Sequence, residues 1–147
     1  MSPASYVNPE RADPEPQPRV VAQPAALRVL IADDERDSLV TLGLLCRGEG
    51  MEVRLVRFGE QVVPAVADFS PDIALLDLVM PDRGGLDIAE ELKERYGDKC
   101  PVLVAVTAYS SEADRKMAKQ SGFDEFIAKP YDPQSLLRRL AALRRRD

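Results

Sequence analysis

The chain has 147 residues, of which 45% are hydrophobic and 31% are charged. This length favours one domain, and the composition is that of an ordinary globular protein. The sequence contains no histidine, which excludes histidine acid–base catalysis, serine–histidine nucleophile pairs and most zinc or iron centres. The net charge of −5 argues against a general nucleic-acid binder. Any chemistry has to come from carboxylates, hydroxyls, lysine or a hard metal ion.

The sequence has no signal for a membrane or for an oxidising compartment. No apolar run approaches the roughly 18 residues that a membrane span needs, and the N-terminus does not have the pattern of a signal peptide. Cys46 and Cys100 are too isolated for a disulfide framework or a zinc site. We therefore expect a cytoplasmic protein without membrane insertion, in which both cysteines are reduced.

Residues 1–26 have the composition of a disordered tail. They hold six of the twelve prolines and almost no periodic apolar pattern. Such a segment buries too little apolar surface to offset the entropy lost on ordering. We predict a disordered, dispensable tail over 1–26 and a folded domain over 27–147.

The first half of the folded part alternates apolar runs with helical patterns. A run over 28–32 is followed by a helical pattern over 39–46. Residues 52–56 alternate with period two, which is typical of a half-exposed edge strand. The next segment contains Pro64, and a proline inside a helix costs about 3 kcal/mol. We therefore expect that helix to begin near Pro64 or to be short.

Two continuous apolar runs, 73–76 and 102–106, are typical of central parallel strands covered on both faces. Between them, Ile88, Leu92 and Tyr96 fall four apart and form the apolar stripe of a helix. This segment therefore continues the alternation of strand and helix.

Capping signals mark the last two helices. Ser111 and Asp114 form a capping box at the start of the first of them. After a short strand near 126–127, Asp132 is the expected N-cap of the final helix and Pro133 its first residue. The chain thus contains five successive repeats of strand and helix.

Five such repeats predict an α/β fold, in which a five-stranded parallel sheet has helices on both faces and right-handed crossovers. Their number and size suit the flavodoxin-like, doubly wound (βα)5 arrangement with strand order 2-1-3-4-5. In such sheets the ligand site lies beyond the carboxyl ends of the strands, beside the switch point between strands one and three.

Reactive side chains stand at these strand ends. Asp33 and Asp34 follow the first strand, Asp77 the third, Thr107 the fourth and Lys129 the fifth. Two carboxylates about 4 Å apart repel by roughly 4 kcal/mol at an effective dielectric near 20. A lysine and a Mg²⁺ ion can relieve this repulsion, and Mg²⁺ keeps positions for water and phosphate. The pattern predicts a Mg²⁺ site at which an aspartate attacks a phosphoryl group, while the hydroxyl and the lysine contact its oxygens.

Five separated motifs occur in order at the expected strand ends. They are Asp33-Asp34, Asp77-Leu78-Val79-Met80-Pro81 with Gly85, Thr107-Ala108, Phe126, and Lys129-Pro130. Each is weak alone, but together they are highly specific. Through them, residues 28–144 resemble the receiver domain of two-component response regulators, the chemotaxis-regulator-like family.

The resemblance implies a role for each acidic residue. Asp77 would be the phosphoacceptor. Asp34 would bind Mg²⁺ directly, with Asp33 close by or acting through water. The backbone carbonyl of Val79 would complete the protein ligands of the metal.

The resemblance also implies a switch. Thr107 would be the switch hydroxyl, and Phe126 the aromatic residue whose rotamer couples to it. Lys129 would contact the phosphate, and the bond between Lys129 and Pro130 would be cis.

The resemblance also implies that two further side chains flank the approach of water to the phosphoryl group. They are Val79 and Tyr109, and Ala108 lies beside the second. Val79 has no polar group to orient a water molecule, and Tyr109 is large enough to cover the phosphoryl group. We therefore expect slow self-dephosphorylation.

The family implies a phosphohistidine donor, either a sensor histidine kinase or a histidine phosphotransfer protein. It implies output to a downstream protein through the face made by the fourth helix, fifth strand and fifth helix. Because little sequence follows the last helix, we expect a stand-alone receiver that is no enzyme beyond its own phosphorylation and slow dephosphorylation. A phosphorelay intermediate or a phosphate sink is the alternative output.

Three other functions fit the residues less well. A phosphatase of the haloacid dehalogenase type needs a second aspartate at the position of Val79. A flavodoxin-like nucleotide binder needs a glycine-rich loop where Asp33 and Asp34 stand. An unphosphorylated interaction module remains open, although all five motifs are intact. Taken singly, Thr107 and Phe126 could also be ordinary strand and core residues.

Overall fold

The computed structural model describes residues 25–143, which form alternating strands and helices. The strands are β1 (Arg28–Ala32), β2 (Glu52–Val56), β3 (Ile73–Leu76), β4 (Val102–Thr107) and β5 (Glu125–Ala128). The α-helices are α1 (Arg36–Gly48), α2 (Val62–Phe69), α3 (Gly85–Tyr96), α4 (Glu112–Ser121) and α5 (Pro133–Leu143). Short 3-10 helices η1 (Gly59–Gln61) and η2 (Gly97–Lys99) precede α2 and follow α3. Most of the predicted tail, residues 1–24, lies outside the described residues.

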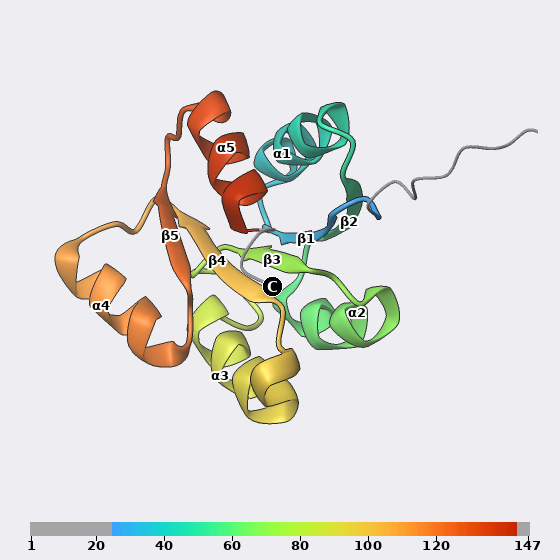
Figure 1. Cartoon of the computed structure of the whole chain (residues 1–147). Helices are drawn as coiled ribbons and strands as arrows, with labels where there is room; N and C mark the ends of the chain where they lie inside the picture. Colours follow the sequence, from blue (N-terminus) through green and yellow to red (C-terminus); the bar gives the residue numbers. More distant parts are fainter. Residues whose placement is uncertain (1–24, 144–147) are drawn as a thin grey trace, which may run out of the picture.

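All five strands are parallel and lie in the order β2-β1-β3-β4-β5. Helices α1 and α5 cover one face of the sheet, and α2, α3 and α4 cover the other (Figure 1). The predicted flavodoxin-like (βα)5 fold is therefore confirmed, including β2 as an edge strand.

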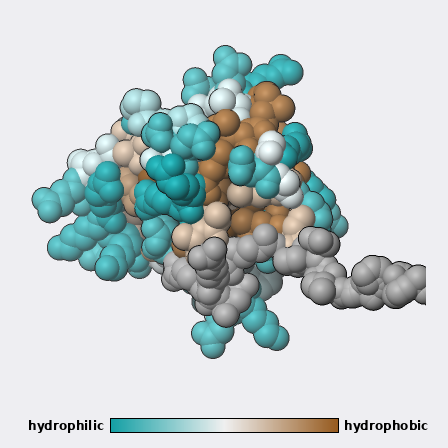
Figure 2. Space-filling view, turned by 45° about the horizontal axis from the view of Figure 1, so that its top comes forward, coloured by the Kyte–Doolittle hydropathy of each residue, from teal (hydrophilic) through white to brown (hydrophobic). Residues whose placement is uncertain are grey.

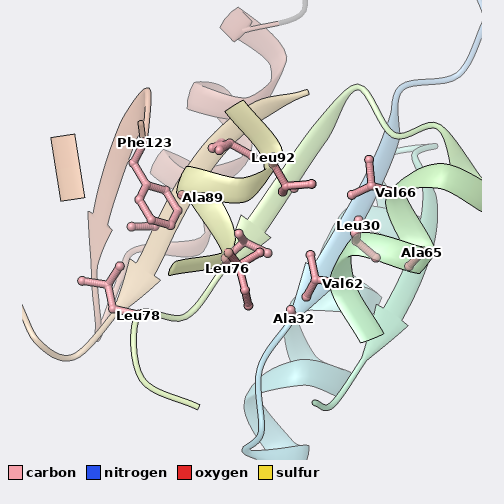
Figure 3. Packing of buried hydrophobic residues seen from close by; sticks show 14 of the residues in the cluster. Leu30, Ala32, Val62, Ala65, Val66, Leu76, Leu78, Ala89, Leu92 and Phe123 are labelled. Carbon is pink, nitrogen blue, oxygen red and sulfur yellow. The ribbon is translucent and has the colours of Figure 1, made fainter. Parts of the chain in front are cut away.

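The sheet separates two hydrophobic cores, because successive side chains of a strand point to opposite faces. Leu30 and Leu76 belong to the core under α2, α3 and α4, where Leu92 and Phe123 also pack (Figure 3). Ile31 belongs to the core under α1 and α5. The central strands are buried on both faces, as their continuous apolar runs predict.

Helix α2 accommodates its proline. It begins at Val62 and has eight residues, so Pro64 lies in its first turn. A backbone N–H in the first turn has no acceptor within the helix, and proline therefore costs little there. The prediction of a short helix beginning near Pro64 is confirmed.

The predicted caps are also present. The Ser111 hydroxyl accepts a hydrogen bond from the Asp114 N–H at 3.0 Å, and the Asp114 carboxylate accepts one from the Ser111 N–H at 3.1 Å. The Asp132 carboxylate accepts from the Ser135 N–H at 2.9 Å, one turn into the helix that begins at Pro133. These local contacts confirm both expected helix starts.

Strand β4 is one residue longer than predicted. Thr107 is its last residue and pairs with Ala128 of β5, whereas the sequence placed it just after the strand. The Thr107 carbonyl accepts a hydrogen bond from the Lys129 N–H at 2.9 Å, which extends the ladder to the end of β5.

Both cysteines are free, as expected. Cys46 is buried, and burial raises the pKa of its thiol to about 11. Among residues 25–143, no helix is long and apolar enough to cross a membrane.

Hydrophilic side chains cover most of the face in Figure 2, around a narrower hydrophobic band.

Candidate functional site

Three carboxylates meet at the carboxyl edge of the sheet. Asp33, Asp34 and Asp77 each offer an oxygen within 4.8 Å of those of the other two. They come together because Ala32 of β1 pairs with Leu76 of β3, so the residues that follow the two strands are neighbours. The three predicted acidic residues that follow β1 and β3 are thus brought to one point.

Lys129 bridges two of these carboxylates. Its Nζ lies 2.6 Å from Asp33 Oδ2 and 3.3 Å from Asp77 Oδ2. Its side chain is only 18% exposed, so the ion pairs are weakly screened by solvent. The peptide bond between Lys129 and Pro130 is cis, as expected.

Burial and charge act against each other in this cluster. Burial raises the pKa of Asp33, and the hydrogen bonds from Lys129 and from the Glu35 N–H only partly offset it. Burial lowers the pKa of Lys129, but its hydrogen bonds to Asp33 and Asp77 and their charges outweigh that effect and raise it overall. Lys129 is therefore a cation at neutral pH, and its one ammonium group contacts two of the three carboxylates, Asp33 and Asp77.

The residues fit a hard divalent cation. The half-buried Asp34 carboxylate makes no hydrogen bond or ion pair within residues 25–143, so both its oxygens are available. Asp33 and Asp77 each accept one backbone N–H, from Glu35 at 2.9 Å and from Val79 at 3.2 Å, and retain further lone pairs. Oxygen donors carrying an excess of negative charge are what Mg²⁺ prefers.

The predicted hydroxyl stands beside this cluster. Thr107 is fully buried, and its Oγ1 accepts a hydrogen bond from the Tyr109 N–H at 3.2 Å. The hydroxyl proton remains free to be donated to a ligand. Val79, Ala108 and Tyr109 are exposed on the loops that follow β3 and β4, where the sequence placed the flanking residues.

The predicted switch aromatic lies on β5. Phe126 pairs with Ala105 of β4, two residues before Thr107, so Phe126 and Thr107 share the sheet face covered by α4. The ring is half-buried, and the Arg115 guanidinium of α4 lies 4.6 Å from its centroid. Sequence reasoning did not single out Arg115, because no spacing rule relates it to the aromatic ring.

Two more residues near the site were missed. An Nη atom of Arg57, in the loop after β2, lies 3.4 Å from the Asp34 carbonyl oxygen. Asp82 accepts hydrogen bonds from the Gly59 and Glu60 N–H groups, both at 2.9 Å. Their partners lie more than twenty residues away in the chain. The position of Arg57 directly after β2 was a signal in the sequence, whereas Asp82 lies in the middle of the loop between β3 and α3 and carried none.

Comparison with known proteins agrees with this geometry. The family model of the response regulator receiver domain matches residues 29–141. The DNA-binding response regulator MtrA of Mycobacterium tuberculosis is 35% identical over 121 residues, covering 82% of this chain and 52% of that protein. The transcriptional regulatory protein CpxR of Klebsiella pneumoniae is 35% identical over 119 residues, covering 81% and 50%. The chain thus spans about half the length of these curated relatives.

Solved structures show the same fold. A putative response regulator from Chloroflexus aurantiacus superposes with a TM-score of 0.78 at 25% identity, covering 83% of this chain and all of that one. The signal receiver domain of a response regulator from Bermanella marisrubri gives 0.74 at 26% identity, covering 81% and 98%. With the match to the family model, these similarities show that the chain belongs to the receiver domains of two-component response regulators.

Proposed function

We propose that this receiver domain accepts a phosphoryl group on Asp77 from a phosphohistidine of a sensor histidine kinase or histidine phosphotransfer protein. One observation carries the proposal. At the carboxyl edge of the sheet, three carboxylates lie close together; Lys129 contacts two of them, and the third, Asp34, has no partner among the described residues. An arrangement that costs electrostatic energy without a ligand is expected at a functional site.

The metal expected there is Mg²⁺, held by Asp33, Asp34, Asp77 and the backbone carbonyl of Val79. When bound, it neutralises negative charge on the carboxylate and on the phosphoryl oxygens. The ligand set follows from the family resemblance and from the free carboxylate oxygens described above.

The chain's own residues then have distinct tasks. An Asp77 carboxylate oxygen forms a bond to phosphorus as the bond from phosphorus to the donor histidine nitrogen breaks, which yields an acyl phosphate and a free imidazole. Lys129, already 3.3 Å from Asp77, balances the charge on a phosphoryl oxygen. The Thr107 hydroxyl donates a hydrogen bond to another, since its proton is free. The protein does no further chemistry beyond slow loss of the phosphate to water.

Movement of Thr107 toward the phosphate is expected to change the space available to Phe126 on the same face of the sheet. This would alter the surface formed by α4, β5 and α5, where we propose that a downstream protein binds. The two free cysteines are consistent with the reducing cytoplasm in which we place this exchange.

Phosphorylation at a single residue tests the proposal. Incubation with acetyl phosphate and Mg²⁺ should add one phosphate, measured by intact mass, and Asp77→Asn should add none. Asp72→Asn is the matched control, because Asp72 lies just before β3 at the opposite edge of the sheet and should leave labelling intact. Full labelling of Asp77→Asn would disprove the assignment.

A further inference from the structure

The loop between β3 and α3 is tied down on two sides by consecutive residues. Asp82 Oδ1 and Oδ2 accept hydrogen bonds from the Gly59 and Glu60 N–H groups of η1, each at 2.9 Å. Arg83 pairs with Asp87 and Glu91 of α3, with N···O distances of 2.6 Å to each. One residue thus fixes the loop to η1 and the next fixes it to α3.

The backbones of this loop and of η1 are in direct contact. A Cβ atom added to Gly59 would lie 2.2 Å from the Arg83 carbonyl oxygen, so no larger residue fits there without displacing the loop. At the other end of the loop, a Cβ atom on Gly85 would lie 2.4 Å from the Asp77 carbonyl oxygen. The segment from Asp77 to Gly85 is therefore held by close packing as well as by hydrogen bonds.

The segment that receives the Asp82 carboxylate is itself held by internal hydrogen bonds. Gln61 Oε1 accepts hydrogen bonds from the N–H groups of Arg57 and Phe58, both at 3.1 Å. Through its side chain, Arg57 also reaches the Asp34 carbonyl. Residues 57–61 thus contact the loop that carries Asp34 on one side and the loop that follows Asp77 on the other.

We propose that Asp82 is a positioning residue of the phosphorylation site. By fixing the loop after Asp77 to the hydrogen-bonded segment 57–61, its carboxylate holds the Val79 carbonyl at a set distance from Asp34. The inference rests on the proposed function, because Val79 and Asp34 matter together only if they share a metal ion. Asp82 itself would contact neither the metal nor the phosphate, because both its carboxylate oxygens accept hydrogen bonds from η1.

Mg²⁺ titration of the unphosphorylated protein by calorimetry tests this role. Asp82→Ala should weaken Mg²⁺ binding by about tenfold, as loss of a residue that orients metal ligands typically does. Asp82→Asn keeps one acceptor oxygen and should fall between the parent and the alanine variant. If Asp82→Ala does not fold, the Mg²⁺ affinity of Asp82→Asn tests the role instead.

Asp72→Ala is the matched control. Its carboxylate also accepts a backbone hydrogen bond, from the Arg28 N–H at 2.8 Å, but at the opposite edge of the sheet. The control should lower the melting temperature without changing the Mg²⁺ dissociation constant, which separates positioning from general stability.

Amide hydrogen exchange in metal-free protein is the second measurement. Asp82→Ala should reduce protection at Gly59 and speed exchange at Val79, whose N–H donates to Asp77 Oδ1. Parent-like Mg²⁺ affinity in both Asp82 variants, or equal weakening in Asp72→Ala, would overturn the inference while leaving the proposed function intact. A parent protein that binds no Mg²⁺ and accepts no phosphate would instead contradict the proposed function.

Discussion

The two edges of the sheet use their carboxylates differently. At the amino edge, Asp72 accepts the Arg28 N–H at 2.8 Å, and Asp124 accepts the Leu103 N–H at 2.9 Å. Asp124 also lies 3.3 Å from Lys93. Each carboxylate there has its own partner and joins a loop or strand end to a neighbouring strand.

At the carboxyl edge, the carboxylates outnumber their cationic partners. Three carboxylates lie within reach of one ligand, and the single ammonium group of Lys129 contacts two of them. The same residue type therefore stabilises the fold at one edge, and at the other we propose that it binds a ligand. What distinguishes the two uses is whether each negative charge already has a partner in the folded protein.

Among the substitutions that test this difference between the edges, Asp34→Ala is expected to have the largest effect, on Mg²⁺ affinity. Because Asp34 is the carboxylate of this cluster that has no partner within residues 25–143, its loss should weaken Mg²⁺ binding by more than the roughly tenfold expected when a residue that only positions the ligands is lost. Asp33→Ala should weaken it less, since Asp33 is already paired with Lys129. Titration of Mg²⁺ against each variant measures the difference. An unchanged affinity in Asp34→Ala would count against the site.

The next effect concerns the lifetime of the phosphorylated state. Val79 and Tyr109 are exposed, and their N–H groups donate to Asp77 and to Thr107, respectively. Neither side chain is suited to orient a water molecule for attack. Combining Val79→Asn with Tyr109→Glu should speed loss of phosphate by about tenfold, equivalent to about 1.4 kcal/mol in the barrier. The decay is followed by intact mass after removal of the phosphodonor. Asp72→Ala, at the other edge, should decay like the parent, and an unchanged or slower decay in the double variant would contradict the shielding argument.

Without Mg²⁺, substitutions at the two edges should change the melting temperature by small amounts of opposite sign. Asp34→Asn removes one unpaired negative charge and should raise the melting temperature by about 4 °C, for roughly 1 kcal/mol of relieved repulsion. Asp72→Ala removes a hydrogen bond and should lower the melting temperature by about as much. Saturating Mg²⁺ should then stabilise the parent more than Asp34→Asn. Destabilisation by both substitutions in metal-free protein would show that Asp34 is structural too.

The smallest effect is expected from removing residues 1–26. The chain enters the fold at the amino edge, where Arg28 is held by Asp72, by Glu52 at 2.7 Å and by the Phe69 carbonyl. These contacts do not involve the predicted tail, so the melting temperature and phosphorylation should stay as in the full chain. Thermal unfolding of the truncated protein measures this, and a fall of several degrees would show that the tail contributes to the fold.

Much of this molecule follows from local sequence. The alternation of apolar runs and helical stripes gives the five repeats, and parallel connection of those repeats brings the residues after β1 and β3 to one edge. The capping box at Ser111 and the short helix at Pro64 depend on neighbours within a few residues. Such features are set by backbone geometry and side-chain period, which a sequence displays directly.

Other features were decided only by tertiary packing. Three contacts join segments whose approach depends on how distant parts of the chain pack. They are the hydrogen bonds of Asp82 to η1, the hydrogen bond of Arg57 to the Asp34 carbonyl, and the contact of the Arg115 guanidinium with the Phe126 ring. The division of Lys129 between Asp33 and Asp77, at 2.6 and 3.3 Å, depends on the same packing. The sequence determined which charged groups lie at the carboxyl edge, because the end of each strand is set by the apolar pattern of neighbouring residues. The fold decided which of those charges found partners, because that depends on distances of a few ångströms between segments far apart in the chain.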